Sequence, residues 1–121
     1  MFDITDVECG WLTLHISDFE FVCSYITDVK YELEKMLHLR DDVYSEVCRL
    51  HFDGEGPELF LTCFVEEYGE KRLHIMWEEY GNNNDRIEQL IVPYEPFCNE
   101  IKKWFDDNEE YYYDNFGYEY D

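Results

Sequence analysis

The chain has 121 residues, of which 45% are hydrophobic and 19% aromatic, and its 30 acidic and nine basic residues give a formal net charge of −21. An intrinsically disordered acidic chain would lack so many apolar side chains, so residues 1–121 are expected to fold as a single domain. The acids are spread over both halves of the sequence, and their field excludes direct binding to nucleic acid and attachment to an anionic membrane.

The first elements that the sequence predicts are a β-hairpin and a helix. Residues 11–17 alternate between apolar and polar side chains, and residues 19–26 alternate again after a turn, which is the pattern of paired strands. Thr27 or Asp28 can cap a helix that runs to about Arg40, because apolar residues then recur at helical spacing.

The middle of the chain predicts further strands, followed by a second helix. Segments bounded by turn residues cover residues 47–53, 59–66, 71–79 and, as a short strand, 87–92. Residues 59–66 are apolar on both faces, as in a strand that is covered on both sides. The second helix is expected to start at Pro93 or Pro96 and to end the core near Phe105. This order predicts an α+β fold, with a single antiparallel sheet of about five to six strands and both helices on one face.

An acidic, aromatic C-terminal segment, residues 106–121, follows the predicted core and contains seven acids, six aromatic residues and no base. Rigid aromatic side chains beside carboxylates suit contact with a basic protein surface. The candidate partner-binding residues are Glu109, Glu110, Tyr111, Tyr112 and Tyr113. The alternative is that this segment is a final strand or a frayed terminus whose tyrosines lie on the domain.

A second candidate surface is the face of the predicted sheet that the helices leave open. Much of the scarce basic and imidazole content would point outward there, which suits a small-ligand or enzymatic site as an alternative function. The residues of this candidate ligand face are Trp11, His15, Arg49, His51, Arg72 and His74. The other interpretation is an ordinary solvated sheet face, with each histidine offset by nearby acids.

The sequence contains no catalytic motif, and it predicts neither a metal nor a cofactor. The four histidines lack metal-ligand spacing, and no nucleophile elbow or phosphate-binding glycine loop is present. The five cysteines show no paired spacing and are expected to be reduced core thiols. Acids at positions 3, 6 and 8 argue against a signal peptide, and no apolar run could span a bilayer, so a cytoplasmic location is predicted.

In size, charge and predicted α+β content, the chain resembles two classes of acidic inhibitor. One is the immunity proteins of bacterial toxin systems, which neutralise a basic nuclease or similar toxin by covering its active site. The other is the DNA-mimic inhibitors, whose carboxylates stand in for phosphates. The first resemblance implies a non-enzymatic binding protein with a basic partner protein, such as a toxin, and an uncharacterised structural or interaction role is a further alternative.

Overall fold

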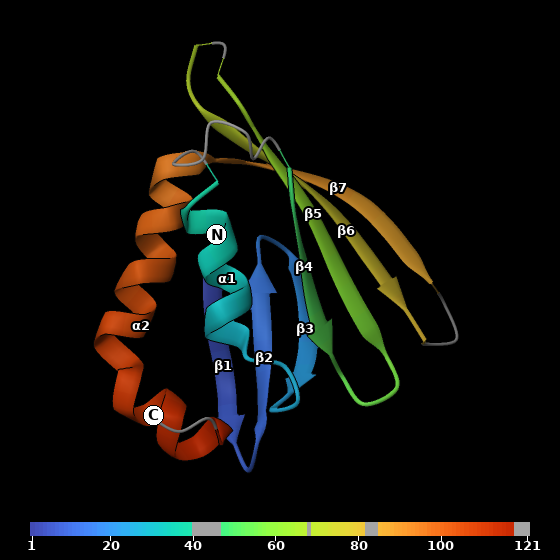
Figure 1. Ribbon diagram of the computed structural model, residues 1–121, viewed down its shortest axis with the longest axis vertical. Helices are drawn as coiled ribbons and strands as arrows, with labels where there is room; N and C mark the ends of the chain where they lie inside the picture. Colours follow the sequence, from blue (N-terminus) through green and yellow to red (C-terminus); the bar gives the residue numbers. More distant parts are fainter. Residues whose placement is uncertain (40–46, 68, 82–84, 118–121) are drawn as a thin grey trace.

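The computed structural model describes residues 1–39, 47–67, 69–81 and 85–117. Strands and helices follow one another along the chain as shown in Figure 1. They are β1 (Phe2–Glu8), β2 (Trp11–Ile16), β3 (Phe19–Ser24), α1 (Val29–Leu37), β4 (Cys48–Asp53), β5 (Glu58–Glu66), β6 (Arg72–Tyr80), β7 (Arg86–Pro93) and α2 (Tyr94–Phe116). The predicted end of the first helix at Arg40 lies outside the described residues.

The strands form two antiparallel sheets, so the prediction of a single sheet of five to six strands is wrong. One sheet has the order β1-β2-β3 and the other the order β4-β5-β6-β7. The α+β class and the two helices are confirmed. The predicted strands and the start of the first helix also match the structure, since Asp28 caps α1 by accepting a hydrogen bond from the amide of Tyr31 at 3.2 Å.

The sheets separate at β4 because side chains occupy the hydrogen-bonding edge that β3 would need. The amide of His51 donates to Glu32 Oε1 of α1 at 2.8 Å, and the amide of Asp53 donates to Thr27 Oγ1 at 2.7 Å. Backbone donors that are already paired in this way gain nothing from a neighbouring strand. The segment that starts α1 therefore closes the β4–β7 sheet on this side.

Replacing Thr27 by valine is expected to lower the free energy of unfolding by about 1–3 kcal/mol, because the isosteric side chain leaves the Asp53 amide without its acceptor. Thr27 is buried, so water cannot easily take over. Urea denaturation of the Thr27→Val variant measures the loss. Thr27→Ser is the matched control, since it keeps the hydroxyl. A Thr27→Val variant that is as stable as the wild type would show that this hydrogen bond does not stabilise the fold.

Strand β1 was not recognised in the sequence, because a bulge interrupts its alternation. Phe2, Ile4 and Val7 point into the core, so the spacing of buried residues changes from two to three within the strand. The pairing with β2 shifts in register between Thr5 and Glu8, and Asp6 has a positive φ of 55°. An extra residue in one strand produces this break in a pattern that otherwise repeats every two residues.

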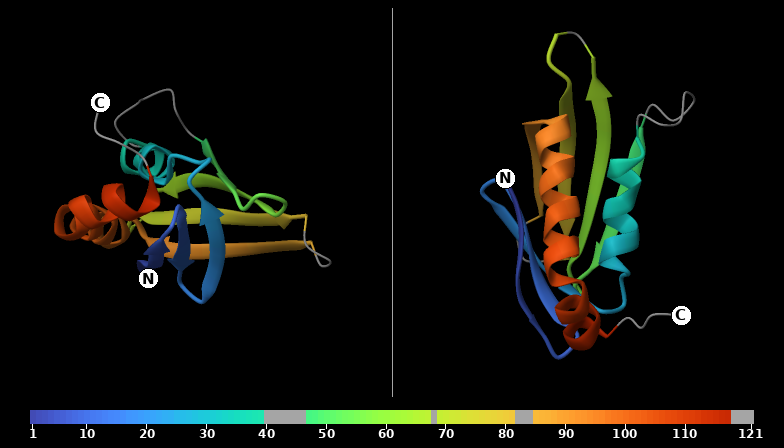
Figure 2. Two further views of the ribbon diagram at one scale, coloured as in Figure 1. Left: turned by 90° about the horizontal axis from the view of Figure 1, so that it is seen from below. Right: turned by 90° about the vertical axis from the view of Figure 1, so that its left-hand side faces the viewer.

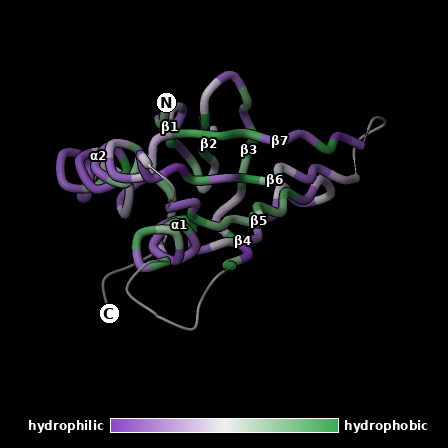
Figure 3. Tube along the Cα trace, turned by 90° about the horizontal axis from the view of Figure 1, so that it is seen from above, coloured by the Kyte–Doolittle hydropathy of each residue, from purple (hydrophilic) through white to green (hydrophobic). Residues whose placement is uncertain are grey.

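The two sheets and both helices enclose one core. Helix α2 lies along β1, and α1 lies along β4, with the two helices next to each other (Figures 1 and 2). Phe2 of β1 packs edge-on against Phe97 of α2 at 6.0 Å between ring centroids, and Phe19 of β3 packs on Trp77 of β6 at 5.4 Å. Much of α2 is hydrophilic (Figure 3). Within the described part of the chain, no helix is both long and apolar enough to cross a membrane.

Candidate functional site

The acidic, aromatic C-terminal segment is the last part of α2, and it belongs to the core as far as Phe116. The helix is kinked at Asn108, whose backbone has φ −130° and ψ 19°. Beyond the kink, Tyr112 and Phe116 are fully buried and their rings stack at 5.2 Å. The prediction that the core ends near Phe105 is therefore wrong. Kinked helices can turn a second apolar stripe inward, and an interpretation based on one straight stripe misses it.

The kink places Tyr112 against both the first helix and the rest of α2. Its ring packs edge-on against Phe105 at 5.2 Å, and its hydroxyl accepts a hydrogen bond from the amide of Lys30 at 3.2 Å. Burial raises the pKa of the Tyr112 hydroxyl, so it stays protonated. Of the five predicted partner-binding residues, this one cannot contact a partner.

The other predicted partner-binding residues are differently placed. Glu109, Glu110 and Tyr111 are exposed, with 47% of Tyr111 accessible. Tyr113 is half-buried, and the Lys30 ammonium lies 5.7 Å from the centre of its ring. The structure thus leaves one tyrosine and two carboxylates of this set free to meet another molecule.

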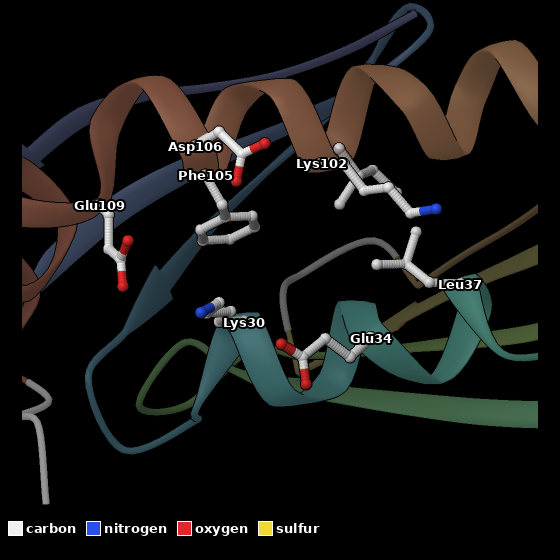
Figure 4. A pocket seen from close by; sticks show the side chains of 8 residues that line it. Lys30, Glu34, Leu37, Lys102, Phe105, Asp106 and Glu109 are labelled. Atoms are coloured by element: carbon white, nitrogen blue, oxygen red, sulfur yellow. The ribbon is translucent and has the colours of Figure 1, made fainter.

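A groove of about 310 Å³ separates α1 from α2, next to this segment (Figure 4). Leu37, Ile101 and Phe105 supply its apolar lining, and charged side chains of both signs surround it. Partial burial lowers the pKa of the Lys30 amine, but Tyr113 and the carboxylates of Glu34 and Glu109 raise it more, so the net shift is upward. Its neighbours therefore stabilise the charged ammonium, and the residues that line the groove form no convergent set of polar groups for a small ligand.

The candidate ligand face is divided between the two sheets. His15 and Trp11 belong to β2, whereas Arg49 and His51 are on β4 and Arg72 and His74 are on β6. His15 Nε2 lies 2.7 Å from Thr5 Oγ1 of the neighbouring strand, and its other ring nitrogen lies 3.7 Å from Glu20. The three histidines were expected on one sheet face, and the structure brings only His51 and His74 onto the same sheet.

Each histidine of the β4–β7 sheet stacks on a phenylalanine and faces a glutamate. His51 stacks on Phe60 at 4.6 Å, and its Nε2 lies 3.1 Å from Glu58. His74 stacks on Phe64 at the same centroid distance, with Nε2 3.5 Å from Glu66.

Arg49 and Arg72 of this sheet also contact an aromatic ring and a carboxylate, respectively. The Arg49 guanidinium lies over the Phe60 ring, 4.3 Å from its centre, and Arg72 forms an ion pair with Glu66 at 3.2 Å. The glutamates beside His51, His74 and Arg72 match the interpretation of an ordinary solvated sheet face, whose histidines are offset by nearby acids.

The sequence reasoning missed the apolar character of this same face. Large hydrophobic side chains are exposed there on three adjacent strands, with Phe64 43%, Met76 38%, Ile87 61% and Ile91 51% accessible. We call this surface the outer sheet face. It comprises Arg49, His51, Phe60, Thr62, Phe64, His74, Met76, Glu78, Ile87, Gln89 and Ile91.

The strand register makes the outer sheet face continuous. Phe64, His74 and Ile91 are direct neighbours across β5, β6 and β7, and Thr62, Met76 and Gln89 form the next row. Side chains in such rows lie about 4.5–5.5 Å apart at Cβ. The signal was present in the sequence, since residues 59–66 are apolar on both faces, but it indicated a covered strand rather than an exposed one.

Acids flank both ends of the outer sheet face. Glu55 and Glu58 lie near one end of the strands, and Glu66 and Glu70 lie near the other, while Glu78 lies within the face, between Phe60 and Ile87. Within the described ranges, no group of three or more histidine, cysteine, aspartate or glutamate side chains is arranged to hold a metal ion.

Comparison with models of protein families found no match. A search of curated proteins likewise returned no significant match. None was found among solved structures.

Proposed function

We propose that this protein is a non-enzymatic binding protein of the inhibitor or immunity type, which neutralises a basic partner protein docked on the outer sheet face. The observation that carries the proposal is the exposure of neighbouring Phe64, Met76 and Ile91 on a molecule with a net charge of −21. Contiguous apolar side chains on an otherwise charged surface are typical of interaction sites.

The composition of the outer sheet face suits the centre of a protein interface. Aromatic residues, methionine and arginine are enriched in such centres, while lysine and acids are depleted. Here Phe60 contacts both the ring of His51 and the guanidinium of Arg49, which restricts the rotamers of all three side chains. Side chains that are already ordered lose little conformational entropy when a partner covers them.

The distribution of charge selects a basic partner. Acids at both ends of the strands would form the rim of the interface, where they meet basic side chains of the partner in contact with water. The field of the whole molecule attracts the same partner from a distance and raises the rate of association. The exposed carboxylates of Glu109 and Glu110 on α2 add to that field without requiring contact.

The experiment compares Ile91→Lys with Tyr111→Lys. Both replace a side chain that is about half exposed, 51% and 47% respectively, and both add the same charge. Ile91 lies within the outer sheet face. Tyr111 lies near the C-terminal end of α2, whereas the N-terminal end of that helix is the one that follows β7. Wild type and both variants are immobilised in parallel to capture proteins from the native host, and binding of the purified partner is then timed at several salt concentrations.

The expected result is a basic protein whose association rate falls steeply with salt and whose affinity drops at least about tenfold for Ile91→Lys but little for Tyr111→Lys. A loss confined to Tyr111→Lys would move the interface to α2. A captured partner that is acidic, or that binds at a rate independent of salt, would contradict the proposed function itself.

A further inference from the structure

Two of the five cysteines face each other across neighbouring strands. Cys48 of β4 and Cys63 of β5 are direct partners in the antiparallel register. Cys63 is fully buried, whereas Cys48 is partly exposed at the start of its strand. The remaining cysteines belong to other elements, with Cys9 at the exposed turn between β1 and β2, Cys23 in β3 and Cys98 in α2.

The backbone geometry of this pair is compatible with a disulfide. The amides of His51 and Asp53 point away from β5, toward Glu32 and Thr27, so the amide of Cys48 points toward β5 by alternation. Cys48 and Cys63 therefore form a hydrogen-bonded pair, whose Cα atoms are typically about 5.5 Å apart. Disulfides occur at Cα separations of about 4.4–6.8 Å, so closure requires rotation of the side chains rather than movement of the strands.

The two thiols differ in reactivity. The hydrogen bond from Cys63 is the main cause that lowers the pKa of Cys48, and it outweighs burial, with a further contribution from the ammonium of Lys35. The pKa of Cys63 is raised by the same hydrogen bond and by burial. Cys48 is thus both the more accessible and the more readily ionised thiol, and Cys63 is placed to react with it.

We propose that Cys48 and Cys63 form a peroxide-reactive dithiol that closes reversibly into a disulfide between β4 and β5. The Cys48 thiolate attacks one oxygen of hydrogen peroxide, the O–O bond breaks, and hydroxide leaves, which gives a sulfenic acid on Cys48. The Cys63 sulfur then attacks the Cys48 sulfur, the S–O bond breaks, and the hydroxyl leaves as water with the Cys63 proton. Two thiols and one peroxide yield one disulfide and two waters.

A small-molecule dithiol would restore the reduced pair by exchange through the partly exposed Cys48 sulfur. The cross-link ties β4 to β5 on the inner face of the β4–β7 sheet, opposite the outer sheet face. Its chemistry does not depend on which partner that face binds.

Peptide mapping of the folded protein after brief treatment with hydrogen peroxide tests the proposal. Free thiols are alkylated in denaturant, and trypsin then cleaves at Arg40, Arg49 and Lys71, which places Cys48 and Cys63 on separate peptides with one cysteine each. The expected product is these two peptides joined, with a mass lower by two hydrogen atoms than their sum, and separated again by dithiothreitol. Alkylated Cys48 and Cys63 in protein whose Cys9 has already been oxidised would overturn the proposal.

Three variants separate the roles of the thiols. Cys63→Ser is expected to stop at a sulfenic acid on Cys48 that dimedone labels, and Cys48→Ser is expected to slow the oxidation of Cys63 at least about tenfold. Cys9→Ser, which removes an exposed thiol without a facing cysteine, should leave the rate of disulfide formation unchanged. Undiminished oxidation of Cys63 in Cys48→Ser would show that Cys48 is not the attacking thiol. If a serine variant fails to fold, the mapping of the wild-type protein still decides whether the disulfide forms.

Discussion

Replacing Tyr112 by alanine is expected to lower the free energy of unfolding by about 3–5 kcal/mol, as for other large aromatic side chains removed from a core. Tyr112 is fully buried, and its ring contacts Phe105 and Phe116 at 5.2 Å each. Alanine would leave a cavity between the two parts of the kinked helix and would remove the acceptor of the Lys30 amide. Urea denaturation, followed by circular dichroism, measures the change.

Tyr111→Ala is the matched control, because the neighbouring tyrosine is 47% exposed and its removal should change stability by no more than about 0.5 kcal/mol. Removal of residues 109–121 takes away Tyr112 and Phe116 together and is expected to destabilise the protein more than Tyr112→Ala. A truncated protein with wild-type stability would mean that the last part of α2 does not contribute to the core.

Replacing Trp77 by alanine is expected to have an effect of similar size, about 3–5 kcal/mol, because this fully buried side chain joins the two sheets. Its ring packs on Phe19 of the β1–β3 sheet at 5.4 Å, and its Nε1 donates to Glu79 at 3.2 Å. The melting temperature and the urea midpoint of the variant should both fall. Trp11→Ala, at an exposed position on β2, is the control and should cost far less.

A double-mutant cycle tests whether the sheets are coupled through this pair. Phe19→Ala and Phe19→Ala/Trp77→Ala complete the cycle, and the coupling energy is expected to be about 0.5–1.5 kcal/mol, as for other aromatic pairs. A coupling energy of zero would indicate that the sheets meet elsewhere.

The positions of most helices and strands could be predicted from the sequence because they depend on local periodicity. Alternation marks β2, β3, β4 and β6, apolar segments between turns mark β5 and β7, and the Asp28 cap marks the start of α1. The division into two sheets could not be predicted in this way. It depends on hydrogen bonds from the β4 backbone to Glu32 and Thr27, and no property of an isolated segment reports which side chain meets which edge.

The candidate site was predicted less well for a related reason. A pattern gives the side of a strand on which a residue lies, but not what covers that side. Phe60 and Phe64 were correctly taken as the second apolar face of their strand, yet neither of the described helices packs on them. The tyrosines at positions 111–113 were taken as one surface, whereas the kink at Asn108 buries Tyr112 and exposes Tyr111.

The side-chain hydrogen bonds along β4 also determine how this protein can meet other β-structures. An exposed edge strand invites a strand from another molecule, which leads to fibrils or to recognition of extended peptides by strand addition. With the amides of His51 and Asp53 already bound to Glu32 and Thr27, β4 offers an incoming strand no donors at these two positions. A protein can therefore expose the apolar outer sheet face to a partner and still resist edge-to-edge polymerisation at β4.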